Sequence, residues 1–302
     1  MNILSLFDGI SCARVALDRA GIKVNNYYAS EIDKYAIQVS SKNWSDIIQV
    51  GSVTDICYGK YDGNGGYDYP KESFFKNRKI IMDNGIGIDL LIGGSPCQNL
   101  SAAGNGKGLE GSESKLFYEF IRILKEVKPK YFILENVASM SPSNRDKISE
   151  IIGVSPIMIN SNLISAQDRK RYFWTNIPNI TLPEKNNLFL KDILNGDEVD
   201  ITERMLRKVK GTLAYKKTWG NIRTLEQKSK TLTVGGQNIS NSGATNILKE
   251  DGRYYALSPI DCERLQSLPD NYTDGISNTQ RYKCCGNAFN ADVIAHILSF
   301  IK

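Results

Sequence analysis

Short apolar runs alternate with amphipathic stretches through the first half of this 302-residue chain. The apolar runs predict buried strands, and the amphipathic stretches predict helices. Strand–helix alternation of this kind is typical of an open, mostly parallel sheet with helices on both faces. The sequence therefore predicts an α/β fold in which ligands bind at the carboxyl ends of the strands.

The limits of these elements follow from the apolar pattern and from two interruptions. Residues 59–87 are rich in Gly, Tyr, Asp and Lys, and we expect an insertion or a long surface loop there. Residues 99–114 are glycine-rich and without periodicity, which is typical of a functional or mobile loop. The expected strands cover residues 2–7, 24–31, 47–50, 89–92 and 131–135, and the expected helices cover 12–20, 34–42 and 115–127.

The alternation fades after about residue 175, which predicts a second, less regular domain. A helix is predicted to start at residues 258–261. Ser258 is a favourable N-cap, Pro259 fits the first turn, and Asp261 interacts favourably with the N-terminal end of the helix dipole. Residues 288–300 predict a closing amphipathic helix. The expected domains are 1–177 for catalysis and cofactor binding, 178–257 as a smaller irregular domain, and 258–302 as a segment returning to the first.

Charge, apolar runs and cysteine usage exclude several classes of protein. The chain has 38 Lys and Arg against 33 Asp and Glu, a net charge of +5 that permits a polyanionic partner. Neither a membrane span nor a secretory signal is expected, because the long apolar runs these need are missing. The six cysteines form no CxxC pair and His296 is the only histidine, so we expect no metal site. Free thiols suit a reducing, cytoplasmic compartment.

Two strand ends point to a cofactor. An expected strand ends at Phe7 and leads through a tight turn at Gly9 into a helix N-terminus. Such a turn can bind a carboxylate or phosphate or can be purely structural, and the three-glycine dinucleotide fingerprint is missing. Glu31 ends the second expected strand, where a carboxylate accepts hydrogen bonds from ribose hydroxyls or caps the next helix. Together the two features suggest an adenosine-containing cofactor.

Three further features suggest chemistry at the same edge of the sheet. Cys97 follows a proline after a hydrophobic strand; most cysteines are inert core residues, but a thiol at a ligand-binding edge can be a nucleophile. Glu135 ends the next expected strand, and a carboxyl group at this edge suggests general acid–base catalysis. Gln167, Arg169 and Arg171 alternate along an expected strand and would share a face. Such a row suits phosphate and base contacts, or is a solvated strand edge.

In this order and spacing, these motifs resemble those of the DNA cytosine-5 methyltransferases, and the match spans almost the whole chain. The wording of SLFDGI, YYASEID and RYFWTN is closest to the de novo branch known from eukaryotes, although a bacterial or bacteriophage enzyme is the simpler expectation. The matching segments are Phe7-Asp8-Gly9, Glu31, Gly94-Ser95-Pro96-Cys97, Glu135-Asn136-Val137, Gln167-x-Arg169-x-Arg171, Arg264-Leu265-Gln266-x-x-Pro269-Asp270 and Gly286-Asn287-Ala288-Phe289.

The resemblance implies a Rossmann-like S-adenosylmethionine-dependent methyltransferase sheet with helices on both faces, plus a smaller irregular target recognition domain. It implies methyl transfer from S-adenosylmethionine to C5 of cytosine in double-stranded DNA, after the base has flipped out. In that reaction Cys97 attacks C6, Glu135 binds the ring N3 and amino group, and Arg169 and Arg171 clamp the base. The implied cofactor residues are Phe7, Asp8, Gly9, Ile10, Glu31, Ile32, Ser52, Val53, Gly94, Pro96, Leu116, Asn287 and Ala288. The implied substrate residues are Gln98, Ser101, Lys107, Asn136, Gln167 and Thr233.

This sequence departs from the family pattern at two places. Ser52 or Asp55 stands where the family often has an aspartate for the adenine amino group, and Ser11 or Cys12 replaces a later glycine of the first motif. The alternatives are an RNA (tRNA) cytosine-5 methyltransferase, a catalytically inactive DNA-binding relative, and a Rossmann oxidoreductase. The polar region 178–250 favours DNA, and the intact Cys, Glu and Arg set favours an active enzyme. The oligomeric state, monomer or homodimer, and the recognition sequence stay open.

Overall fold

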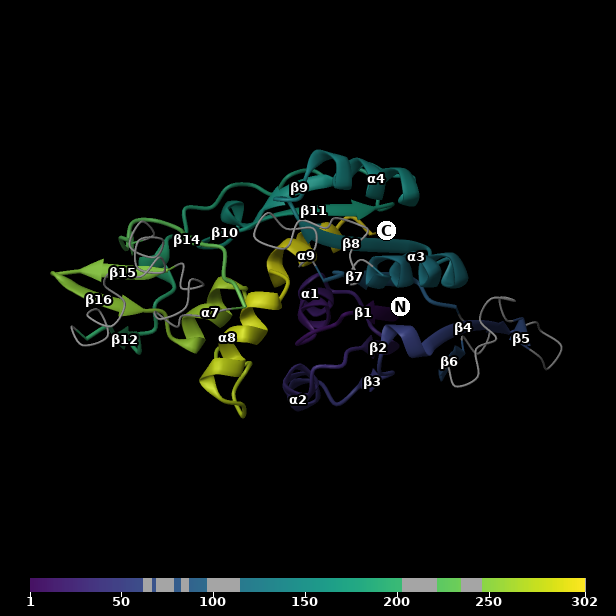
Figure 1. Ribbon diagram of the computed structural model, residues 1–302, viewed down its shortest axis with the longest axis horizontal. Helices are drawn as coiled ribbons and strands as arrows, with labels where there is room; N and C mark the ends of the chain where they lie inside the picture. Colours follow the sequence, from purple (N-terminus) through teal and green to yellow (C-terminus); the bar gives the residue numbers. More distant parts are fainter. Residues whose placement is uncertain are drawn as a thin grey trace. The chain divides into compact units, whose positions relative to one another are not determined.

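The structure, a computed structural model, describes residues 1–61, 67–68, 79–82, 87–96, 115–202, 222–234 and 246–301. The chain divides into two compact units (Figure 1). The first comprises Met1–Ile159, Lys170–Ile180 and Ile297–Lys302, and the second comprises Asn160–Arg169 and Thr181–His296. Each unit has its own sheets and its own apolar core. The domain limits expected at residues 177 and 257 stay a prediction.

A seven-stranded sheet forms the centre of the first unit. In spatial order its strands are β3 (Ile47–Gln49), β2 (Asn26–Ser30), β1 (Asn2–Leu6), β7 (Leu90–Gly93), β8 (Tyr131–Val137), β11 (Lys170–Thr175) and β9 (Ile157–Asn160). The pairs from β3 to β8 are parallel, and β11 runs antiparallel to β8. Strand β1 is buried along its whole length, as expected for a central strand covered on both faces.

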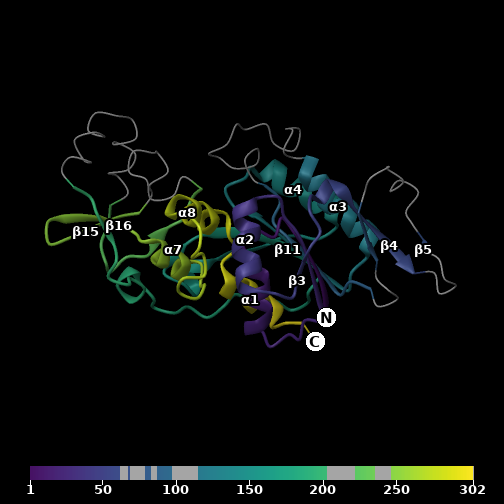
Figure 2. The same cartoon turned by 90° about the horizontal axis from the view of Figure 1, so that it is seen from below.

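The helices of the first unit cover both faces of this sheet. They are α1 (Cys12–Arg19), α2 (Lys34–Asn43), α3 (Lys115–Val127) and α4 (Pro142–Ile152). The chain passes from β1 through α1 to β2 in one direction along the sheet, and from β7 through α3 to β8 in the other. Because crossovers between parallel strands are right-handed, α1 and α3 lie on opposite faces (Figure 2). The predicted α/β fold is confirmed.

One face of the sheet and helix α3 share the main core. Phe117 and Phe120 of α3 are buried against Leu4 of β1 and Leu91 of β7. At Gly93, the last residue of β7, an added Cβ would lie 2.8 Å from the Leu6 carbonyl oxygen. The ends of β1 and β7 therefore approach so closely that only glycine fits between them and α3.

The described residues between 56 and 82 form strands. In the described part, β4 (Ile56–Tyr61) pairs in parallel with β6 (Lys79–Met82) and antiparallel with β5 (Tyr67–Asp68). Of the two expectations for residues 59–87, a long surface loop is wrong for these strands, and an insertion stays a prediction. Arg122 of α3 supports the start of this sheet, because its Nη2 donates to the carbonyl oxygen of Ile56 at 2.9 Å.

The expected single strand through Gln167, Arg169 and Arg171 is also wrong. Strand β10 (Gln167–Asp168) pairs with β14 (Ser229–Lys230), whereas β11 begins at Lys170 and pairs with β8. Arg169 lies between them, and its backbone N–H donates to Asn160 Oδ1 at 2.9 Å. The side chains of the three residues therefore do not share the face of one strand.

In its described part, the second unit combines short strands with helices. Its four-stranded sheet has the order β12 (Val199–Asp200), β16 (Arg253–Ala256), β15 (Ile247–Glu250) and β13 (Ile222–Arg223). Helices α7 (Pro259–Leu265) and α8 (Asn278–Asn287) contribute to a core with Leu190, Leu232, Leu257, Leu265 and Cys285. The predicted start of α7 is confirmed, since Ser258 and Asp261 form a reciprocal capping box.

The last helix, α9 (Ala291–Leu298), starts three residues after the predicted start at 288. Ala288 has extended backbone at the end of α8, and the side chain of Asn290 accepts the N–H of Val293 at 3.1 Å. Asn290 thus caps α9 and sets its first turn. Among the described residues, no helix combines the length and apolar character needed to cross a bilayer.

Candidate active site

The turn after β1 has an unusual backbone. Phe7, Gly9 and Ser11 have φ angles of 57°, 59° and 60°, in the left-handed region that residues with a Cβ rarely adopt. The N–H of Ser11 donates to the carbonyl oxygen of Asp8 at 3.1 Å, and α1 begins at the next residue. Ile10 is buried. Surrounding contacts must hold this turn, because Phe and Ser do not favour such a conformation by themselves.

Glu31 binds this turn from the end of β2. Its Oε2 accepts the N–H of Gly9 at 2.8 Å, and its Oε1 accepts the N–H groups of Ile32 and Asp33 at 2.7 and 2.8 Å. A carboxylate has about four lone-pair sites, so capacity remains for a further donor such as a ribose hydroxyl. The adjacent Ile32 side chain is 76% exposed and offers an apolar contact. This donor and acceptor set fits an adenosine group.

Asp8 is buried next to Glu31. Its Oδ1 accepts the Tyr27 hydroxyl at 2.6 Å, and its Oδ2 accepts the Ser11 hydroxyl at 2.5 Å. Burial and, to a smaller extent, the nearby Glu31 charge raise the pKa of Asp8, the hydroxyls of Ser11, Ser5 and Tyr27 oppose the shift, and the resulting pKa is about 6. The side chain of Asp8 therefore points into the protein, where it holds the turn.

The segment after β3 supplies the next predicted cofactor residues. Ser52 caps a short 3-10 helix (Val53–Asp55), because its Oγ accepts the N–H of Thr54 at 3.3 Å. The Val53 side chain is buried in the core, and Arg122 Nη2 binds the Val53 carbonyl oxygen at 3.1 Å. Asp55 is exposed and accepts the Thr54 hydroxyl. Neither Ser52 nor Asp55 is singled out as the adenine contact by this geometry.

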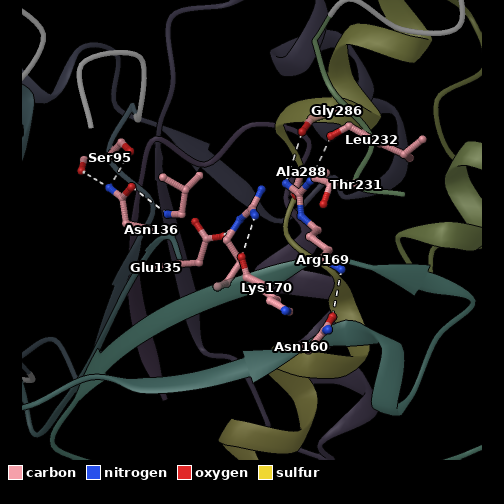
Figure 3. Close-up of polar contacts among 12 residues, drawn as sticks. Ser95, Glu135, Asn136, Asn160, Arg169, Lys170, Thr231, Leu232, Gly286 and Ala288 are labelled. Atoms are coloured by element: carbon pink, nitrogen blue, oxygen red, sulfur yellow. Dashed lines mark hydrogen bonds and ion pairs between the residues drawn. The ribbon is translucent and has the colours of Figure 1, made fainter. Parts of the chain in front are cut away.

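The ends of β7 and β8 are joined through Asn136. Its Nδ2 donates to the carbonyl oxygen and the hydroxyl of Ser95 at 3.3 and 3.2 Å, and both residues are buried (Figure 3). Its Oδ1 accepts the N–H of Val137. Asn136 thus fixes the segment Gly94–Pro96, which leads to Cys97. The Asn136 amide is engaged with protein groups, and its predicted contact with substrate stays a prediction.

Glu135 and Arg171 form an ion pair across two strands. In the antiparallel β8–β11 register, Glu135 lies opposite Phe173 and Arg171 lies opposite Val137, so the two side chains are diagonal neighbours on one face. Arg171 Nε lies 2.7 Å from Glu135 Oε1, and both side chains keep a small exposed fraction, 14% and 12%. Arg171 Nη1 also donates to the Lys170 carbonyl oxygen. This is a charged, partly accessible pair at the carboxyl end of β8.

Arg169 has a different environment, inside the second unit. Its guanidinium donates to the carbonyl oxygens of Leu232, Gly286 and Ala288 at 3.1, 3.2 and 2.8 Å, and the residue is 4% exposed (Figure 3). The Arg169 guanidinium therefore joins the strand end at β10 to the segment after β14 and to the end of α8. Its predicted contact with a base stays a prediction, but its observed partners are backbone carbonyls.

Gln167 is fully buried in the same unit. Its Nε2 donates to the Leu265 carbonyl oxygen at 3.0 Å, and its Oε1 accepts the N–H of Leu232 at 3.0 Å. Thr233 is half-buried, and an added Cβ on Gly286 would lie 2.5 Å from the Thr233 carbonyl carbon. These contacts give Gln167 an organising place in the second unit, and its predicted contact with substrate stays untested.

Of the remaining predicted residues, three lie in the described part of the chain and four lie outside it. Leu116 of α3 is half-buried against the main core, Asn287 is exposed, and Ala288 is buried in the second unit. Among the described residues no group of three or more His, Cys, Asp or Glu side chains could hold a metal ion. Cys97, Gln98, Ser101 and Lys107 lie outside the described residues.

Sequence reasoning missed several residues that organise the site. Tyr27 and Ser40 belong to the hydrogen-bond network of Asp8, and Arg122 binds the carbonyl oxygens of Val53 and Ile56 at the first residue and just after the last residue of the 3-10 helix. Gln266 Nε2 donates to the Cys285 carbonyl oxygen at 2.6 Å. The tyrosine at position 27 of the expected strand 24–31 is a usable signal, because a hydroxyl that becomes buried needs a hydrogen-bond partner.

The parallel sheet, the left-handed turn after β1 and the carboxylates near the ends of β2 and β8 define an α/β fold with a candidate ligand site at its strand ends. Similarity to solved structures supports this fold. The chain aligns with the Entamoeba histolytica methyltransferase EhMeth at a TM-score of 0.74 and 16% identity, covering 99% of this chain and 97% of that one. It aligns with the S. pombe Dnmt2 methyltransferase at a TM-score of 0.68 and 16% identity, covering 99% and 97%.

The family follows from sequence comparison. The model of the C-5 cytosine-specific DNA methylases matches residues 1–302, so the chain belongs to that family. It is 27% identical to the type II methyltransferase M.FnuDI of Fusobacterium nucleatum, over 100% of this chain and 94% of the relative. It is 26% identical to the type II methyltransferase M.HhaI of Haemophilus parahaemolyticus, over 98% and 93%. The orphan methyltransferase M.Rho11sI of Bacillus phage rho11s is 34% identical over 49% of this chain and 24% of its own length. The predicted family and the expected bacterial or phage relationship are confirmed.

Proposed function

We propose that this protein transfers a methyl group from S-adenosylmethionine to C5 of cytosine in double-stranded DNA. The observation that carries the proposal is the Glu135–Arg171 pair at the carboxyl end of β8, in a chain that belongs throughout to the cytosine-5 methylase family. The type II names of the bacterial relatives support DNA as the substrate. A bacterial or phage-infected cytoplasm is the proposed location.

The cofactor site would be built from the turn after β1 and the strand end of β2. Glu31 offers its remaining acceptor capacity to ribose hydroxyls, and Ile32 offers an apolar face to a purine. Phe7, Gly9 and Ile10 would line the same site, together with the segment at Ser52 and Val53. When bound, S-adenosylmethionine supplies an electrophilic methyl group.

Cytosine C5 is a poor nucleophile, and covalent catalysis would overcome this. The Cys97 thiolate would add to C6, forming an S–C6 bond and raising the electron density at C5. Glu135 would hydrogen-bond N3 and the exocyclic amino group, which stabilises the charge that develops on the ring. After C5 has gained the methyl group, loss of its proton expels the Cys97 thiolate and restores the aromatic ring.

Arg171 would serve both the base and Glu135. Its guanidinium contacts Glu135 and donates to the Lys170 carbonyl oxygen. An arginine carries five N–H donors, so others remain to bind the O2 atom of a flipped cytosine or an adjacent phosphate. Because C5 and C6 are inaccessible in a duplex, the base would have to leave the helix first.

The irregular part of the chain would read the DNA sequence. We assign residues 178–257 to target recognition, with 1–177 as the catalytic region and 258–302 as the segment that completes it. Gln98, Ser101 and Lys107 would contact the DNA, and Thr233 would lie near the target base. Lys107→Ala should then weaken DNA binding, whereas unchanged affinity would remove Lys107 from this set.

A map of 5-methylcytosine in a methylation-free bacterial host tests the reaction. We expect methylcytosine in one sequence context from the unmodified chain and none from Cys97→Ser produced at the same soluble level. Methylated RNA without methylated DNA would replace the DNA substrate by RNA, and absence of both would contradict the proposal. Duplex DNA containing 5-fluorocytosine tests the covalent step, because a C5 fluorine cannot leave as a proton does and the adduct should persist.

A further inference from the structure

A chain of buried hydroxyl groups leads to the carboxylate of Asp8. Tyr27 O–H donates to Asp8 Oδ1 at 2.6 Å, and Ser11 O–H donates to Asp8 Oδ2 at 2.5 Å. Ser11 Oγ lies 2.6 Å from Ser40 Oγ of α2, and Gln49 Nε2 of β3 lies 3.4 Å from the same Ser40 oxygen. Tyr27, Ser11 and Ser40 are fully buried. This hydrogen-bond network therefore connects β2, the residue before α1, α2 and β3 to one carboxylate.

The hydrogen bonds of this chain have a defined direction. Ser11 has a single hydroxyl hydrogen, and it is given to Asp8, so Ser40 must donate to Ser11. Gln49 in turn donates to Ser40. Every donor thus points toward Asp8, an order that favours the ionised carboxylate and that consecutive hydrogen bonds strengthen cooperatively.

Protonation of Asp8 conflicts with this order. A protonated carboxyl must donate from one oxygen, yet both oxygens accept a hydroxyl in the structure. A neutral carboxyl is a weaker acceptor than a carboxylate, and its added proton needs an acceptor of its own, so the two hydroxyl contacts weaken or rearrange. Phe7, Gly9 and Ser11, which have left-handed φ angles, flank Asp8. A weakened contact of Asp8 would therefore change the conformation of this turn.

We propose that Tyr27 and Ser40 are positioning residues for the methyl donor, because they keep Asp8 ionised and thereby hold residues 7–11 in their left-handed turn. This inference rests on the proposed function, in which that turn binds S-adenosylmethionine. Neither residue is expected to touch the cofactor, since both side chains are fully buried.

A dependence of cofactor affinity on pH follows. The groups that face Asp8 are the hydroxyls of Tyr27, Ser11 and Ser5 and the carboxylate of Glu31. The pKa of Asp8 is about 6, so its carboxylate is present at pH 7.5 and is lost below pH 6. Affinity for S-adenosylmethionine should therefore fall as the pH is lowered through 6. Removing the Tyr27 hydroxyl should raise the pKa and move this fall to higher pH.

Calorimetric titration of the full chain with S-adenosylmethionine between pH 5 and 8 tests the inference. Two matched pairs are available: Tyr27→Phe against Tyr28→Phe on the other face of β2, and Ser40→Ala against the exposed Ser41→Ala. We expect Tyr27→Phe to raise the dissociation constant about tenfold at pH 7.5, as for a lost hydrogen bond to a charged group. Ser40→Ala should have a smaller effect in the same direction, and the controls none.

The pH midpoint separates positioning from a merely structural role. A general loosening of the fold weakens binding at every pH, whereas the inference requires the midpoint to rise in Tyr27→Phe. Unchanged affinity and midpoint in both Tyr27→Phe and Ser40→Ala would overturn the inference and leave the proposed function intact. If the unmodified chain binds no S-adenosylmethionine at any pH, the proposed function fails and the inference fails with it. Ser40→Ala decides the question if Tyr27→Phe does not fold.

Discussion

Arg171 Nε lies 2.7 Å from Glu135 Oε1, across the antiparallel pair of β8 and β11. The pair stands at the carboxyl end of β8, where α/β sheets bind their ligands. Its partial exposure matters, because a fully buried pair could not reach a substrate and a fully exposed pair would be screened by solvent. The ion pair therefore orients the Glu135 carboxylate and leaves further Arg171 donors for a bound base.

Arg171→Ala should abolish most activity while sparing the fold. The change removes the group that orients Glu135 and any contact to a flipped base, so we expect kcat to fall by about 100-fold or more. The exposed neighbour Lys170→Ala is the control and should keep normal activity. Steady-state methylation of a DNA oligonucleotide measures both variants, alongside thermal unfolding. Activity of Arg171→Ala close to that of Lys170→Ala would contradict the role given to this pair.

Arg169→Ala should mainly lower the stability of the fold, whereas Arg171→Ala should mainly lower the activity. Three backbone carbonyl oxygens lose a buried, charged donor, so we expect the free energy of unfolding to fall by about 3 kcal/mol. The melting temperature measured by calorimetry should drop clearly, and far more than in Arg171→Ala. Equal melting temperatures in the two variants would show that the Arg169 contacts contribute little to the second unit.

The contrast between these two arginines marks the limit of sequence reasoning. Strands such as β1 and the helix α3 were predictable, because their apolar patterns are local and survive packing. The sequence also placed Glu135 at a strand end. It predicted one strand face for Gln167, Arg169 and Arg171, since alternation was the local signal available.

The interruption between β10 and β11 at Arg169 could not be predicted from the residues next to it in the sequence. The carbonyl groups it binds belong to Leu232 and Ala288, 63 and 119 residues further along the chain. The Glu135–Arg171 pair likewise depends on the β8–β11 register. The hydrogen-bond network of Asp8 depends on how α2 packs, because Ser40 of α2 contacts Ser11. Partners set by tertiary packing override a two-residue alternation, and a single sequence contains no local sign of them.

Gly286→Ala tests the close approach between α8 and the segment at Thr233. An added Cβ would lie 2.5 Å from the Thr233 carbonyl carbon and 2.8 Å from the Val234 N atom, so backbone must move. We expect a loss of roughly 1–3 kcal/mol, typical of overpacking. The adjacent, exposed Asn287→Ala should be nearly neutral. Urea unfolding of both variants provides the comparison, and equal midpoints would mean that the segment relaxes freely.

Asp8→Asn should flatten the dependence of stability on pH. The folded-state pKa of Asp8 is about 6, above the ordinary value of 3.8 for an aspartate, so the folded chain binds more protons than the unfolded chain between these values. The free energy of unfolding therefore falls as the pH rises from about 4 to 6, by roughly 3 kcal/mol for this group alone. Asp8→Asn has no such proton to lose, whereas the exposed Asp18→Asn keeps the native slope. Thermal unfolding at pH 4.5 and 7, without cofactor, measures the difference between the two pH values for each chain. If that difference is the same in Asp8→Asn and in the unmodified chain, Asp8 does not titrate in this range, and the pH midpoint of cofactor binding must come from another group.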